Sequence, residues 1–208
     1  MQDNALQKIA AFFFDYFGIA VSMFMAYVFC RNWVSPSPSA LEDILFLTLL
    51  IAMEFFMVHS AVFMTISVWV FFPFYGIFVL ALFLSSGDSR IIWLYMAIVL
   101  FRSAQGFFNK SRAASEYRVI TAFIRAWVYF IPFIIVMIVA DKGIIPKLGL
   151  STEFLDSNGY FNLSGGGLFS DAPHIAMCLG TVYYIFLAAN DFCMLRNPQK
   201  LEKIRSWM

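Results

Sequence analysis

An apolar stretch from residue 44 to residue 86 constrains this chain more than any other feature, because only one carboxylate and one imidazole, those of Glu54 and His59, interrupt it. One straight helix of that length would measure about 65 Å, roughly twice the thickness of the hydrocarbon layer of a membrane. The stretch therefore predicts two membrane-spanning helices, near residues 41–65 and 68–86. The alternative is one long tilted helix followed by a short one.

The composition of the whole chain agrees with a membrane environment. Of the 208 residues, 62% are hydrophobic and only 13% are charged, whereas a soluble domain is typically about half apolar and about a quarter charged. We expect an all-α fold, a polytopic transmembrane helix bundle that forms a single integral membrane domain over residues 1–208. About six spans are predicted, and five is the alternative count. The spans are expected near residues 9–30, 41–65, 68–86, 91–108, 119–140 and 173–195, with an outer loop at 141–172.

The distribution of lysine and arginine predicts the orientation of these spans. With six spans both termini lie on one side of the membrane, and that side collects eight cations: Lys8, Lys110, Arg112, Arg118, Arg196, Lys200, Lys203 and Arg205. The other side collects four: Arg31, Arg90, Lys142 and Lys147. Cytoplasmic loops carry the excess of positive charge, so we expect both termini in the cytoplasm.

A small set of ionisable residues falls inside the predicted spans. Its members are Asp15, Glu54, His59, Arg102, Arg125 and Asp191. Counted at 1.5 Å per residue, five of them lie at a similar depth in the inner half of the membrane, and Glu54 lies deeper. Because an unpaired charge in hydrocarbon is costly, we expect ion pairs between helices. The sequence leaves open which acid meets which arginine.

Three interpretations of this intramembrane polar cluster remain open. In the first it is a structural clamp that holds helices together, and in the second it lines a path for a substrate or a proton. In the third, Arg102 and Arg125 extend their side chains to the membrane interface. Helical spacing places a further polar stripe on one face of the last span. The stripe consists of His174, Thr181, Tyr184, Ala188 and Asp191.

Motifs for catalysis and metal binding are not recognisable, so we expect no catalytic residues, no cofactor and no metal site. The sequence has no GxSxG, P-loop or HExxH pattern. Its only two histidines, His59 and His174, are expected at opposite depths of the membrane. The cysteines Cys30, Cys178 and Cys193 are widely spaced and are interpreted as small buried apolar residues.

Three short segments carry a resemblance to a known family. They are Ala52-Met53-Glu54, the run from Phe71 to Phe78, and Pro173-His174-Ile175 followed by Gly180. In this order they resemble a family of bacterial polytopic membrane proteins that is catalogued only as a domain of unknown function. The chain has Ala-Met before the glutamate where aromatic residues are expected in that family. The resemblance implies a membrane fold, located in a bacterial inner membrane, and no particular activity.

Three hypotheses for function follow. The favoured one is a non-catalytic accessory or assembly partner that acts through helix contacts, with the lipid bilayer, a membrane protein or a second copy as partner and no nucleic acid. The alternative is a small transporter or channel with a polar cavity open to the cytoplasm, in which Glu54 or His59 exchanges protons. The weakest is an intramembrane enzyme acting on lipid, with His174 near the outer interface as general base.

Overall fold

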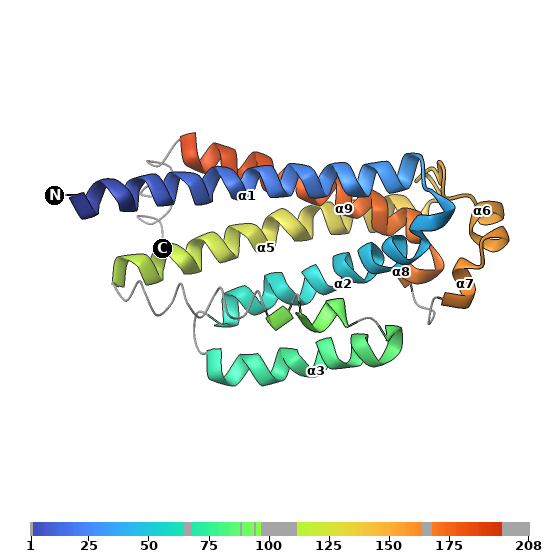
Figure 1. Ribbon diagram of the computed structural model, residues 1–208, viewed down its shortest axis with the longest axis horizontal. Helices are drawn as coiled ribbons and strands as arrows, with labels where there is room; N and C mark the ends of the chain where they lie inside the picture. The colour runs from blue at the N-terminus through green and yellow to red at the C-terminus, as the bar shows by residue number, and fades with distance from the viewer. Residues whose placement is uncertain are drawn as a thin grey trace.

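The computed structural model describes residues 2–64, 68–87, 89–93, 95–96, 112–163 and 168–196, and most of these are helical (Figure 1). The helix content is 86%, and no strand occurs among the described residues, so the predicted all-α class is confirmed. The long helices are α1 (Gln2–Val34), α2 (Leu41–Met64), α3 (Val68–Ser86), α5 (Arg112–Asp141) and α9 (Pro173–Arg196).

Three segments of the described helices are long and apolar enough to cross a membrane. They are Tyr16–Val34 in α1, Ile120–Asp141 in α5 and Pro173–Arg196 in α9. These helices mark the chain as a membrane protein. They do not confirm the predicted count of about six spans, which stays a prediction.

The long apolar stretch is divided between two helices. Within it α2 ends at Met64 and α3 begins at Val68. The two helices pack against each other through a small core in which Met53 of α2 meets Tyr75 and Val79 of α3. Two helices can bury these faces against each other, whereas a single long helix would leave them in contact with lipid.

The centre of the bundle is α9, which packs against α1, α5 and α2, while α3 lies on the far side of α2 (Figure 1). In this view α1, α3 and α5 run from the left end to the right, and α2 and α9 run back. The beginning of α1 and the end of α9 therefore lie at the same end of the bundle.

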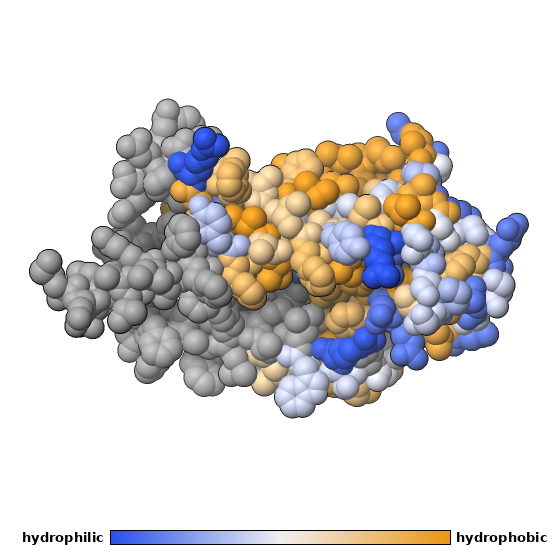
Figure 2. Space-filling model, turned by 45° about the horizontal axis from the view of Figure 1, so that its top comes forward, coloured by the Kyte–Doolittle hydropathy of each residue, from blue (hydrophilic) through white to orange (hydrophobic). Residues whose placement is uncertain are grey.

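The opposite end carries a cap formed by the segment that was predicted as the outer loop. It contains three short helices, α6 (Thr152–Ser157), α7 (Tyr160–Leu163) and α8 (Leu168–Asp171). The indole Nε1 of Trp33 donates to the carbonyl of Pro146 at 2.9 Å, and the amide of Gly149 donates to the carbonyl of Trp33 at 3.1 Å. These bonds tie the cap to the end of α1. On the face drawn in Figure 2, hydrophilic side chains gather toward this end, and apolar side chains cover the middle.

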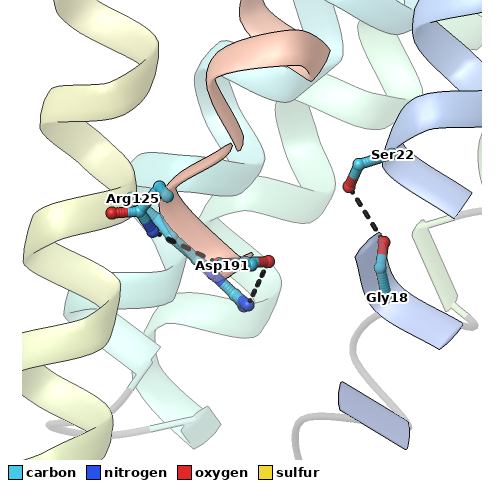
Figure 3. Close-up of polar contacts among 5 residues, drawn as sticks. Gly18, Ser22, Arg125 and Asp191 are labelled. Carbon is cyan, nitrogen blue, oxygen red and sulfur yellow. Dashed lines mark hydrogen bonds and ion pairs between the residues drawn. The ribbon is translucent and has the colours of Figure 1, made fainter. Parts of the chain in front are cut away.

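A very close contact joins α1 to α9. A Cβ added at Gly180 would overlap the ring of Phe29, so only glycine allows the two helices to approach this far. The buried face of α1 continues from Phe29 through Ala26 to Ser22 at helical spacing. The hydroxyl of Ser22 donates to the carbonyl of Gly18 at 3.0 Å, which satisfies it within its own helix (Figure 3).

Candidate functional site

The carboxylate of Glu54 lies where α2 meets α9 and accepts hydrogen bonds from two neighbouring tyrosines. The hydroxyl of Tyr184 donates to Oε1 at 2.8 Å, and the hydroxyl of Tyr183 donates to Oε2 at 3.3 Å. Successive residues of a helix point about 100° apart, so α9 places one phenol on each side of the carboxylate. Both carboxylate oxygens are thus engaged by α9.

A third tyrosine brings α5 into the same site. The hydroxyl of Tyr129 donates to the backbone carbonyl of Ile51 at 3.0 Å, one turn before Glu54 on α2. Its ring meets that of Tyr183 edge to face, with the centroids 5.1 Å apart. We call Glu54, Tyr129, Tyr183 and Tyr184 the tyrosine–glutamate cluster. It joins α2, α5 and α9 at one level of the bundle.

The surroundings of this cluster are apolar. The side chains of Tyr129, Tyr183 and Tyr184 are each less than 10% exposed. The ring of Phe29 lies 5.6 Å from that of Tyr184, and the ring of Phe133 stacks on Tyr129 at 6.0 Å. Little competing solvent reaches these hydroxyls, so each hydrogen bond is electrostatically stronger than it would be in water.

An ion pair joins α5 to α9 at a second level, nearer the start of α5 and the end of α9 than the cluster is. A guanidinium nitrogen of Arg125 lies 3.0 Å from a carboxylate oxygen of Asp191 (Figure 3). Asp191 is seven residues after Tyr184 on α9, and Arg125 is four residues before Tyr129 on α5. Both spacings keep these residues on the faces that carry the cluster. The side chain of Asp191 is 16% exposed and that of Arg125 is 50% exposed, so the pair lies at the edge of the bundle.

The predicted intramembrane residues thus fall into three groups. The structure brings Arg125 and Asp191 together and places the hydroxyls of Tyr183 and Tyr184 on the carboxylate of Glu54. The backbones of Asp15 and His59 lie in α1 and α2, but their side chains are outside the described part of the structure. Arg102 lies outside the described residues altogether.

His174 lies at the other end of α9, in its first turn beside the cap. In the cap, the ammonium of Lys147 donates to the hydroxyl of Thr152 at 2.7 Å. Within the described residues, no group of three or more histidine, cysteine, aspartate or glutamate side chains is placed to hold a metal ion.

Sequence reasoning missed Tyr183 and Tyr129 as members of the site. Tyr184 was on the predicted polar stripe of the last span, which was the available signal. Tyr183 lies about 100° away from that stripe, and Tyr129 looks like one more aromatic residue in a chain that is 19% aromatic.

No family model matches the chain, and no curated protein or solved structure matches it either.

Proposed function

We propose that the chain is an integral membrane protein with a non-catalytic role, an accessory or assembly partner that acts through helix contacts. The observation that supports this most is that polar side chains between the helices bond to one another. The carboxylate of Glu54 and the hydroxyls of Tyr183 and Tyr184 bond to one another across the α2–α9 contact. Groups used in this way hold helices in register.

The ion pair supports the same role. Arg125 and Asp191 join α5 to α9 in the way that the tyrosine–glutamate cluster joins α2 to α9. Two polar contacts on one helix specify both its rotation and its height against its neighbours, because each needs its partner at hydrogen-bonding distance. A rigid bundle with a defined outer surface is what an assembly partner needs.

Photo-crosslinking in native membranes tests this role. A crosslinking amino acid is placed at exposed positions such as Phe24 of α1 or Ile138 of α5, which are 62% and 53% exposed. We expect a discrete product of constant mass from neighbouring positions on one face, either with a second copy or with one other membrane protein. The buried position Leu179 serves as the control. A monomer with no protein crosslink from any exposed face would contradict the proposal.

A second candidate function is proton-coupled transport, with Glu54 as the residue that exchanges protons. It is favoured by the alignment of the ion pair and the tyrosine–glutamate cluster along α9, which is a series of polar groups reaching toward the midplane. Flux into liposomes tests it. Transport that is lost in Glu54→Gln but retained in the wild type and in the control Tyr27→Phe would support this candidate. Equal flux in the wild type and both variants would contradict it.

For localisation we propose a bacterial inner membrane with both termini in the cytoplasm. The support comes from the excess of cations on one predicted side and from the shared end of α1 and α9 (Figure 1). Reporter fusions at each terminus, one active only in the cytoplasm and one active only outside it, test this topology. Opposite results at the two termini would require an odd number of spans.

A further inference from the structure

A wholly apolar groove of about 340 Å³ runs along the outer face of α5. Its floor and walls include Phe123, Trp127, Ile131 and Pro132 of α5, and Phe186 of α9 closes one side. Trp127 and Phe186 are each 52% exposed, so the groove opens to the surroundings of the bundle. In a membrane the surroundings of this face are lipid.

A half-exposed cation flanks the groove. Arg125 directly follows Ile124 and lies one turn before Val128, and both of these neighbours line the groove. Side chains of a helix lean toward its N-terminus, so the guanidinium reaches toward the end of the groove that holds Ile120. A guanidinium has five N–H donors. The bond to Asp191 uses part of this capacity, and half of the side chain stays exposed.

The lining of the groove differs from that of the helix contacts in the same molecule. Where α1 meets α9, the contact is built from small residues, among them Gly180, Ala26 and Ala176. Small residues are what lets two helix backbones approach within a membrane. The groove is lined by no small residue, and its branched and aromatic side chains suit a narrow flexible chain better than a second helix.

We propose that this groove binds one acyl chain of an anionic phospholipid, whose phosphate accepts hydrogen bonds from Arg125. The apolar trough matches the chain, and the cation at its end matches the headgroup. Arginine pairs with phosphate through two parallel hydrogen bonds, and basic positions between membrane helices select anionic headgroups. Trp127, a residue type enriched at membrane interfaces, lines the same groove.

Native mass spectrometry of the purified full-length chain tests the proposal. After delipidation the protein is offered phosphatidylglycerol and phosphatidylcholine with identical acyl chains. We expect one retained lipid per chain and a preference of about fivefold for phosphatidylglycerol, the effect of one cation near an anionic headgroup. Equal retention of the two lipids by the wild-type protein would overturn the role of Arg125.

Two variants separate the contributions of headgroup and chain. Arg125→Gln combined with Asp191→Asn removes both charges without leaving either unpaired, and we expect the ratio of the two lipids to fall to about one. Ile131→Trp fills the groove and is expected to abolish retention of both lipids. Ile135→Trp is the matched control, because Ile135 is 55% exposed one turn further along α5 and does not line the groove. Equal lipid retention by Ile131→Trp and Ile135→Trp would overturn the site.

A second measurement needs no variant. A phosphatidylglycerol with a photoreactive acyl chain is incorporated with the wild-type protein in vesicles, and the labelled peptides are identified. We expect labelling to concentrate on residues 123–131. Labelling spread evenly over the exposed apolar faces of α1 and α5 would overturn the proposal. A photoreactive residue at position 131 that crosslinks to another protein and not to a lipid would also overturn the proposal.

Discussion

The hydroxyl of Tyr184 donates a hydrogen bond of 2.8 Å to the carboxylate of Glu54, and this bond joins α9 to α2 across 130 residues of sequence. Glu54 is the deepest of the predicted intramembrane acids. The hydroxyl of Tyr183 donates to the other carboxylate oxygen of Glu54, so two phenols of α9 bond to one side chain of α2.

Removing the hydroxyl of Tyr184 should destabilise the bundle. Hydrogen bonds between membrane helices average about 0.6 kcal/mol and reach about 1.7 kcal/mol, and we expect Tyr184→Phe to cost about 1 kcal/mol. Tyr183→Phe should cost less because its bond is longer, at 3.3 Å. Unfolding in detergent measures both, with Tyr27→Phe, at a position 60% exposed, as the control. A larger loss for Tyr183→Phe than for Tyr184→Phe would contradict the order of the two bonds.

The ion pair should show coupling between its members. Arg125→Gln leaves the carboxylate of Asp191 mostly buried without its cation, so the single variant should lose more stability than Arg125→Gln combined with Asp191→Asn. We expect a coupling free energy of about 0.5–1 kcal/mol, at the low end for contacting residues, because Arg125 is half exposed. A double-mutant cycle from thermal unfolding measures it. If the two losses in the free energy of unfolding simply add, the ion pair contributes nothing to stability.

The contact between α1 and α9 should be intolerant of one added methyl group. Gly180→Ala places a Cβ in the ring of Phe29, and overpacking of this kind costs about 1–3 kcal/mol. Gly18→Ala in α1 is the control, since no atom of another element lies within 4 Å of the added Cβ. Combining Gly180→Ala with Phe29→Leu should restore part of the loss. Equal unfolding temperatures for the two glycine variants would show that α1 and α9 do not approach each other this closely.

The cap should respond to strongly alkaline pH through Tyr160. Burial raises the pKa of Tyr160 to about 12, the carboxylate of Asp171 adds to this shift, and the nearby hydroxyl of Thr48 works against it. The Thr48 hydroxyl donates instead to the carbonyl of Ile44 at 2.8 Å, and among the described residues the Tyr160 hydroxyl has no partner of hydrogen-bonding geometry.

Because the folded state favours the neutral phenol, the stabilisation that Tyr160 provides is fully present below about pH 10 and is lost as the pH rises through about 12. The unfolding temperature followed from pH 9 to pH 12.5 should therefore fall less steeply in Tyr160→Phe. At pH 8 this variant should be as stable as the wild type, since no hydrogen bond is removed. Identical pH profiles for the two proteins would place the phenol in contact with solvent.

The sequence predicted the helical class because hydrophobic runs of about 20 residues leave few other options in a membrane. It also singled out Glu54, Arg125 and Asp191, because ionisable residues are rare in such runs. Their partners could not be predicted in the same way. Whether Asp191 meets Arg125 or Arg102 depends on the rotation and height of each helix, and neither follows from spacing within one helix.

Tyrosine illustrates the same limit. A phenol can sit in an apolar core through its ring or serve a polar site through its hydroxyl. Tyr184 and the exposed Tyr27 have the same chemistry, and only the position of Glu54 on a distant helix distinguishes them. The short helices of the cap could not be predicted either. A helix such as α6 depends on a single N-cap residue, here Ser151, whose hydroxyl accepts a hydrogen bond from the amide of Phe154.

The contact of Phe29 with Gly180 has a consequence for biosynthesis. Helix α1 finds its main packing partner in α9. Roughly 150 residues separate the two contact positions, and they take on the order of 10–30 s to translate at about 5–20 residues per second. Throughout that interval the face of α1 that carries Ser22, Ala26 and Phe29 has to be covered by lipid or by insertion machinery. The contact of α1 with α9 thus cannot form until α9 has left the ribosome, and nascent chains that stop before α9 should be substrates for membrane quality control.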